Sequence, residues 1–283
     1  MKEITLACEA FQKLLEEQLE RIRNMNGEKT DFSTKKQVII GVIDGDGIGP
    51  IITAQATRVL EKLLAGAERS GAELVLCNCR PVTEDGAEHP LPADEQFAKE
   101  TVLDVNAFWD AFNTPWINQF TGTAHRLYAA KLFDGVRYPL GMLHEDYYVL
   151  PDLIARCTKI LCLPFTGYYV LRHAGSITDG AKHEVRLAMT KGDIHRAEYF
   201  LQNGWYDRAE GALTDAALFL HSNKRAYDLT KPGHRAEFAE TRRELCRVYD
   251  ALAAQKGTAS LKLRAAALHI GLPVFAGYLK ARR

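Results

Sequence analysis

The chain has 283 residues, in which 36 lysines and arginines balance 36 aspartates and glutamates. This balance gives no global positive field, so the composition does not favour a nucleic-acid-binding protein. We also expect no signal peptide and no membrane span, because the N-terminus MKEITLACEAF lacks an apolar core and no apolar run is long enough to cross a bilayer. The scattered cysteines favour reduced thiols in a cytosolic protein, mostly as small core side chains: Cys8, Cys77, Cys79, Cys157, Cys162 and Cys246.

The first third of the chain alternates between helical and strand patterns. Apolar residues at helical spacing predict an amphipathic helix over 11–22, and a polar linker follows it. The run QVIIGVI predicts a buried strand, the next helix ends near Gly71, and AELVLCNCRPV predicts a second strand. This β-α-β order predicts an α/β sheet in which residues 38–43 and 74–79 are neighbouring strands.

Beyond residue 94 the pattern becomes increasingly helical. KILCLP and GYYVLR each predict a short strand, and the chain from about Ala181 to its end predicts helices packed on an edge of the sheet. The expected domains are a helix and linker over 1–36, an α/β core over 37–180 and a helical region over 181–283. Four aromatic residues at helical spacing are expected in the core rather than in a sugar-binding platform: Trp109, Phe112, Trp116 and Phe120.

The chain from about residue 72 to 283 resembles the second half of bacterial family 2 glycosyltransferases, which are inverting enzymes of the GT-A fold, and four stretches carry the resemblance. They are GAELVLCNCRPVTEDG, HRLYAAKLFDGVRYPLGMLHEDYYVLPDLIARCTKI, LPFTGYYVLRHAGSIT and EYFLQNGWYDRAE. The resemblance implies a truncated GT-A-like, Rossmann-like mixed sheet. It also implies a hexosyltransferase that transfers a sugar from a nucleotide-sugar donor to a hydroxyl acceptor with inversion, as in polysaccharide biosynthesis.

The first 64 residues resemble a different family. KEITLACEAFQKLLEEQLERI and VIIGVIDGDGIGP look like the N-terminus of an isocitrate or isopropylmalate dehydrogenase, with GDGIGP as the local signature. The chain therefore looks like a hybrid joined between Val59 and Ala72. Because the nucleotide-binding first half of a glycosyltransferase is not recognisable before Asp44, we expect at best weak sugar transfer.

The resemblance assigns its catalytic carboxylates to the triplet His144-Glu145-Asp146. Asp146 matches the family's general base, which removes the proton of the acceptor hydroxyl, and the adjacent Glu145 is expected to raise its proton affinity. His144, Arg172 and Tyr128 are candidate substrate-binding residues, with Arg172 suited to the donor diphosphate. The alternative is that residues 144–146 only cap a helix that begins near Tyr147.

Asp44 and Asp46 allow two interpretations. As an Asp-x-Asp motif at a strand end, they would hold Mg²⁺ or Mn²⁺ on the donor diphosphate through hard oxygen ligands. As part of a dehydrogenase-like segment, they belong to a glycine-rich turn without a metal. His125 and Arg126 could line the acceptor cleft, although the family has asparagine and lysine at the matching positions.

Three functions remain open from the sequence. The first is a cytoplasmic glycosyltransferase, at the inner face of the membrane where its glycan acceptor is lipid-linked. The second is a fragment of an NAD(P)-dependent dehydrogenase of the isocitrate or isopropylmalate type. The third is a non-catalytic interaction module formed by the helical region. No nucleic-acid partner is expected for any of them.

Overall fold

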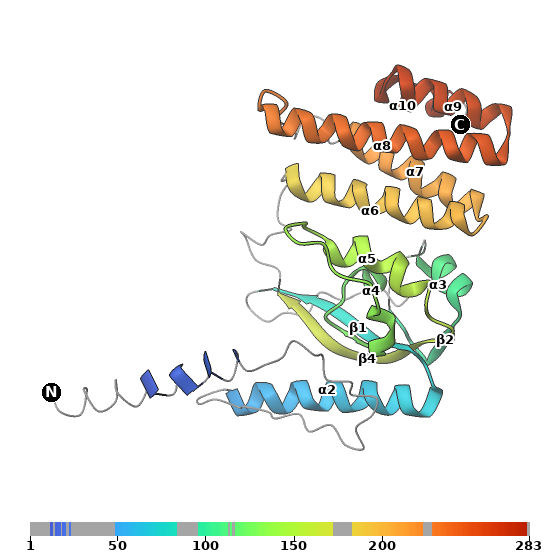
Figure 1. The fold of residues 1–283 in the computed structure, drawn as a ribbon. Helices are drawn as coiled ribbons and strands as arrows, with labels where there is room; N and C mark the ends of the chain where they lie inside the picture. The colour runs from blue at the N-terminus through green and yellow to red at the C-terminus, as the bar shows by residue number, and fades with distance from the viewer. Residues whose placement is uncertain are drawn as a thin grey trace. The chain divides into compact units, whose positions relative to one another are not determined.

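The computed structural model describes residues 12–13, 15–17, 19–20, 23, 49–83, 96–112, 114, 117–171, 183–222 and 228–281. The chain divides into two compact units, Met1–Thr53 and Ala54–Arg283. The second unit is a mixed α/β structure that is mostly helical (Figure 1). It contains the sheet and the helices that cover it.

Four strands form one mixed sheet in the order β2-β4-β1-β3. The central strands, β1 (Leu74–Val82) and β4 (Ile160–Leu171), run parallel. The outer strands, β2 (Thr101–Leu103) and β3 (Arg126–Tyr128), pair antiparallel with β4 and β1 respectively. The structure therefore contains the α/β sheet that the sequence predicts, with strand β1 at the expected position.

Strand β4 corrects the prediction of two short strands, because KILCLP and most of GYYVLR form one continuous element. The pairing with β1 passes from Cys77↔Leu163 to Asn78↔Thr166, so Pro164 and Phe165 fall in a register shift. A proline lacks the N–H that a ladder requires and is tolerated at such an irregularity. The shift lets the strand continue through a residue that ordinarily interrupts one.

Both edges of β1 are occupied between Leu74 and Cys79. Strand β4 pairs along one edge, and β3 pairs with Leu74–Leu76 on the other. Beyond β3, the side-chain amide of Gln119 donates to the Cys79 carbonyl at 3.1 Å and accepts from its N–H at 2.8 Å. The expected neighbour of β1, residues 38–43, lies outside the described residues.

Alternate residues of β1 and β4 face two separate apolar layers. Val75, Cys77, Leu161 and Leu163 pack against helix α2 (Gly49–Ser70), which ends as predicted at Gly71. The opposite face packs against α3 (Val105–Phe112) and α5 (Glu145–Ile154), near the short helices α4 (Ile117–Thr121) and η3 (Ala130–Phe133). This alternation follows from the two-residue repeat of a strand.

The chain from residue 183 onward forms helices, as its alanine-rich pattern predicts. They are α6 (His183–Gln202), α7 (Tyr206–Ser222), α8 (Pro232–Lys256), α9 (Ala259–Ile270) and α10 (Leu272–Lys280). In Figure 1, α6 lies over α5, with the sheet on the other side of α5. The helical region therefore packs on the helix layer that covers one face of the sheet, and the predicted packing on a sheet edge is wrong.

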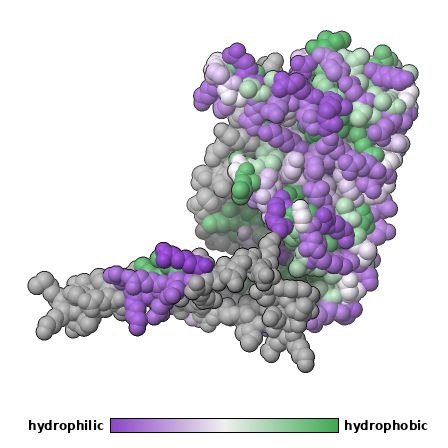
Figure 2. Space-filling model, in the orientation of Figure 1, coloured by the Kyte–Doolittle hydropathy of each residue, from purple (hydrophilic) through white to green (hydrophobic). Residues whose placement is uncertain are grey.

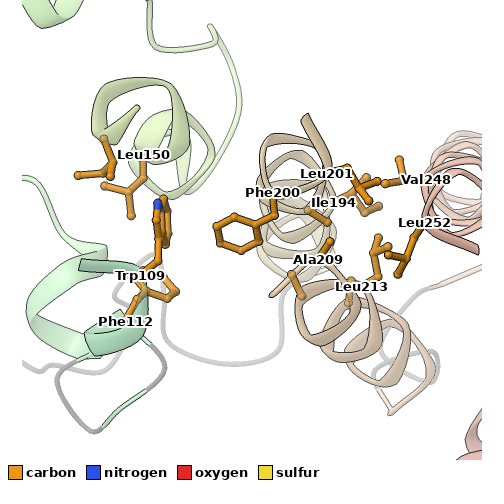
Figure 3. Close-up of a cluster of buried hydrophobic side chains, with 14 of the residues drawn as sticks. Trp109, Phe112, Leu150, Ile194, Phe200, Leu201, Ala209, Leu213, Val248 and Leu252 are labelled. Carbon is orange, nitrogen blue, oxygen red and sulfur yellow. The ribbon is translucent and has the colours of Figure 1, made fainter. Parts of the chain in front are cut away.

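The sheet's helix layer and the helical region share one hydrophobic core (Figure 3). The ring of Phe200 on α6 points toward the ring of Trp109 on α3, with centroids 5.1 Å apart and planes at 89°. Trp109, Phe112 and Phe120 are buried, as predicted, whereas Trp116 lies outside the described residues. The core continues through Leu201 to helix α8, where Figure 3 shows Val248 and Leu252.

Hydrophilic residues cover much of the helical face that Figure 2 shows, with hydrophobic residues scattered among them. Within the described residues, no helix combines the length and apolar character that a membrane crossing requires.

We expect Phe200→Ala to lower the free energy of unfolding by about 3–5 kcal/mol, the usual cost of removing a buried aromatic ring. Because Phe200 belongs to a core shared by both layers, fluorescence and far-UV circular dichroism should report one coincident transition at lower denaturant. The exposed Leu263 on α9 supplies the control, and Leu263→Ala should change stability by at most about 0.5 kcal/mol. If Phe200→Ala shifted the unfolding transition in only one of the two probes, the result would contradict a shared core.

Glu73 ties the start of β1 to the start of β4. Its carboxylate accepts hydrogen bonds from the N–H groups of Thr158 and Lys159, each at 3.0 Å, and pairs with Lys131 at 3.3 Å. Burial opposes its ionisation, but these backbone and side-chain donors outweigh it and lower the pKa of Glu73 to about 2. Where the two parallel strands begin, the Glu73 carboxylate thus accepts hydrogen bonds from backbone N–H groups in the way that a strand carbonyl would.

We expect Glu73→Gln to cost about 1.5–3 kcal/mol at neutral pH, the usual value of hydrogen bonds to a charged group. Because the folded-state pKa is below the ordinary value of 4.5, the contribution is complete above that pH and is lost as pH falls toward 2. Urea titrations between pH 7 and pH 3 should show the wild type and the variant converging at low pH. Glu61 on α2 is exposed and serves as the control. The free energy of unfolding of Glu61→Gln should equal that of the wild type at every pH.

Candidate functional site

Helix α5 begins with the two carboxylates that the sequence singles out, Glu145 and Asp146. The residue before it, His144, has φ 55° and ψ 37°, the left-handed conformation that non-glycine residues rarely adopt. Such a conformation costs on the order of 1–3 kcal/mol and persists where the surroundings enforce it. His144 therefore turns the chain sharply and presents both carboxylates at the exposed start of the helix.

The alternative of a purely capping role agrees with the geometry only in part, because Asp146 accepts a hydrogen bond from a first-turn N–H but is not the N-cap residue. The helix starts at Glu145 rather than near Tyr147, so Asp146 lies in the first turn and is not the N-cap. The N-cap residue is His144, and its side chain makes no capping hydrogen bond. Asp146 accepts a hydrogen bond from the N–H of Tyr147 at 2.8 Å.

Asp146 is half-buried, whereas Glu145 is exposed. Burial raises the pKa of Asp146, and the negative charge of Glu145 raises it further; the Tyr147 amide, Arg126 and His144 counteract only part of this. The net direction is upward from the ordinary value of 3.8. A carboxylate with raised proton affinity is a better proton acceptor than a free aspartate, which suits a general base.

Strand β3 carries two polar side chains, Arg126 and Tyr128, and the charge of Arg126 acts on Asp146. Arg126 and Tyr128 are two residues apart, so they lie on the same face of the strand. Nη1 of Arg126 donates to the Tyr128 hydroxyl at 3.1 Å, and Nη2 donates to the carbonyl of Gln119 at 3.5 Å. Arg126 is only 9% exposed, and its Nε makes no hydrogen bond within the described part of the chain.

The loop before α5 supplies Tyr138, the last member of the group. Burial raises the pKa of Tyr138 to about 12, and Tyr128, Asp146 and Glu145 add to the increase while Arg126 opposes it. These mutual effects place the side chains within electrostatic range of one another. We call Arg126, Tyr128, Tyr138, His144, Glu145 and Asp146 the Asp146 cluster.

His125 does not line the cluster as the sequence suggested. It is 2% exposed, and its Nε2 lies 2.9 Å from the carbonyl oxygen of Gln119. Burial, followed by the neighbouring Arg126, lowers the pKa of His125 to about 4, so the imidazole is neutral and donates this hydrogen bond. His125 holds Gln119, which in turn occupies the edge of β1 at Cys79.

A buried polar group fixes the start of α5 to α6. The hydroxyl of Tyr147 donates to Asp193, and Arg196 donates to that hydroxyl and, at 2.9 Å, to Asp193. Asp193 and Arg196 are 8% and 7% exposed, so each charge is paired in the interior. Tyr147 directly follows Asp146, and this triad therefore sets where Asp146 lies.

Gly192 permits this contact. A Cβ atom at this position would lie 2.5 Å from Cδ1 of Tyr147, closer than atoms can approach. Helix α6 thus needs glycine at this position to admit the tyrosine ring.

Part of this site was predictable from the sequence. Asp146, Glu145, His144 and Tyr128 are candidates from the sequence; the structure places the first three in succession at the start of α5, and Tyr128 on β3. Arg126 is also a candidate from the sequence, as a residue of the acceptor cleft, whereas Tyr138 and the triad of Tyr147, Asp193 and Arg196 are not predicted. The two-residue spacing of Arg126 and Tyr128 in a short strand was the available signal.

The donor side of the predicted site rests on residues that the structure does not describe, namely Asp44, Asp46 and Arg172. Within the described ranges, no group of three or more histidine, cysteine, aspartate or glutamate side chains could hold a metal ion. The five described cysteines are free thiols, and four of them are buried: Cys77, Cys157, Cys162 and Cys246.

Comparison with known proteins assigns no family to the chain. No protein-family model matches the sequence, and a search of curated proteins returns no match. The chemistry of the site is therefore argued from its own residues.

We expect Gly192→Ala to destabilise the protein by about 1–3 kcal/mol, because the added methyl group must displace the Tyr147 ring. Gly211 on α7 is the matched control, since a methyl group added there would meet nothing within 4 Å. Gly211→Ala should stabilise the protein by up to about 1 kcal/mol through helix propensity. Thermal and urea unfolding of both variants would measure these changes in stability. Equal effects of Gly192→Ala and Gly211→Ala would show that the contact between Gly192 and the Tyr147 ring does not constrain α6.

Proposed function

We propose that the Asp146 cluster is the acceptor side of an inverting sugar transferase that uses a nucleotide-sugar donor. The observation that carries the proposal is Asp146 itself, a half-buried carboxylate of raised pKa at a strained helix start, within electrostatic range of Arg126. Its support also includes the resemblance of the His-Glu-Asp triplet and its flanking segments to family 2 glycosyltransferases of the GT-A fold.

In the proposed reaction, Asp146 accepts the proton of an acceptor hydroxyl. The hydroxyl oxygen forms a bond to the anomeric carbon of the donor sugar from the face opposite the diphosphate. The bond from that carbon to the diphosphate oxygen breaks, and the nucleoside diphosphate leaves with the electron pair. The attraction of the Arg126 guanidinium limits how far burial can raise the pKa of the base.

The other members of the cluster orient Asp146 and its substrate. Tyr128 is held by Arg126, and Tyr138 keeps its proton at neutral pH because its pKa is about 12. Both hydroxyls can therefore donate to acceptor oxygens. A Mg²⁺ or Mn²⁺ ion on Asp44 and Asp46 would neutralise the donor diphosphate when bound, and the proposal assigns no step to it.

We expect Asp146→Asn to lower the rate of transfer by about 10²–10⁴, the usual contribution of a general base. Because burial raises the pKa of Asp146, its ionised form is disfavoured in the folded state, so the variant should be as stable as the wild type or more stable at neutral pH. The wild-type rate should decline as pH falls through the raised pKa. Asp134→Asn, a change of an exposed aspartate outside the cluster, should leave the rate unchanged.

The first assay combines UDP-sugars with Mn²⁺ and follows the release of UDP. The transfer rate that it measures for the wild type is the reference for Asp146→Asn. Calorimetric titration with UDP-sugars plus Mn²⁺, and separately with NAD(P)⁺ plus isocitrate, distinguishes the transferase from the dehydrogenase. Binding of NAD(P)⁺ and isocitrate alone would overturn the proposal. Binding of neither pair would favour an interaction module formed by the helices.

A further inference from the structure

Helices α9 and α10, which lie farthest from the sheet in Figure 1, each expose large apolar side chains. Leu263 and Ile270 on α9 are 51% and 74% exposed, and Val274 on α10 is 43% exposed. Because Leu263 and Ile270 are seven residues apart, they lie on the same face of their helix. Figure 2 shows hydrophobic residues at the same end of the molecule. We call the exposed sides of α9 and α10 the outer face.

The opposite sides of both helices are buried in one core. Leu261 and Leu268 on α9 belong to the same hydrophobic cluster as Leu272 and Phe275 on α10. The Phe275 ring also packs edge-on against Tyr249 of α8, with centroids 5.6 Å apart and planes at 80°. Since the buried sides of α9 and α10 join this one core, the exposed apolar side chains point away from it.

The charge of this part of the chain is one-sided. Residues 251–283 contain no aspartate or glutamate, and their charged residues are all basic: Lys256, Lys262, Arg264, Lys280, Arg282 and Arg283. Lys256 and Arg264 are neutralised by Glu210 of α7. Lys262 and Lys280 are exposed, and the structure gives them no ion pair in the described part of the chain.

Carboxylates near the outer face belong to other helices. His269 meets Asp250 of α8 at 2.8 Å, and Asp215 of α7 lines the same surface depression as Lys280 without forming an ion pair with it. Helical spacing places Lys262 and Lys280 beside the apolar side chains rather than among them. The outer face therefore combines protruding apolar groups with flanking positive charge.

We propose that the outer face docks on an anionic membrane surface, without crossing it. Leu263, Ile270 and Val274 enter the boundary between headgroups and acyl chains, and Lys262 and Lys280 contact lipid phosphates. Apolar side chains flanked by lysines, on helices that carry no carboxylate, suit a position in the plane of a membrane interface.

Two other occupants fit this surface less well. A nucleic acid would engage the lysines but would leave the apolar side chains in water. A second copy of the chain in a two-fold dimer would bring the lysines of one outer face against the same lysines of the other. Docking needs neither donor nor acceptor, so its test is independent of the sugar-transfer proposal.

Flotation of the full chain with lipid vesicles tests the proposal. Vesicles of phosphatidylcholine with phosphatidylglycerol should bind the protein at low salt, and binding should weaken as salt screens the charges. Pure phosphatidylcholine vesicles should bind little protein. Ile270→Gln should weaken binding to the anionic vesicles by about tenfold through lost apolar burial. Lys262→Gln should weaken it by about fivefold, the usual contribution of one cation at an anionic surface.

Matched controls come from exposed residues elsewhere in the protein. Leu60 on α2 is 44% exposed and Lys99 is exposed, so Leu60→Gln and Lys99→Gln should bind vesicles as the wild type does. Far-UV circular dichroism should show the wild-type fold in every variant. Equal binding of neutral and anionic vesicles, or an unchanged affinity in Ile270→Gln, would overturn the proposal. So would a dimer that Ile270→Gln dissociates, in a protein that binds no vesicles.

Discussion

Trp109 is completely buried, and atoms from two layers of the molecule enclose it. Phe108 and Phe112 come from its own helix, whereas Tyr199 and Phe200 come from α6, more than 80 residues later. An indole ring buries a large apolar surface, so removing α6 would expose the face of α3 and α5 that points away from the sheet. The sheet with its own helices is therefore not a complete folding unit, and the helical region belongs to its core.

This shared core also explains how the candidate site is held. The Asp146 cluster lies at a helix start, where backbone is ordinarily least constrained. Tyr147 reaches into α6 and is fixed there by Asp193 and Arg196, while strand β3 fixes Arg126 from the other side. The left-handed backbone at His144 is maintained between these two attachments. Positioning of the carboxylate thus depends on residues almost 50 positions later in the chain.

The parts predicted from sequence are those that local patterns determine. The end of α2 at Gly71, strand β1 and the late helices follow from periodicity and a glycine stop. Strands β2 and β3 have three residues each, which is too short for a periodic signal. Continuity of β4 through Pro164 depends on its register against β1, and the meeting of Arg126 with Asp146 depends on tertiary packing. Local sequence carries neither kind of information.

The amide side chains of Asn78 and Gln119 have a consequence for the protein's behaviour at high concentration. Gln119 pairs with Cys79 on one side of the strand ladder, and Asn78 pairs in the same two-bond manner with the backbone of Phe97, at 2.8 and 3.1 Å. An unpaired strand edge is a template on which another chain can add a strand and begin to aggregate. Among the described residues, the side chain of Gln119 takes the place of a strand and pairs with both the N–H and the carbonyl of Cys79. The short β3 can therefore begin at Arg126, opposite Leu76, without leaving that part of the central strand open to self-association.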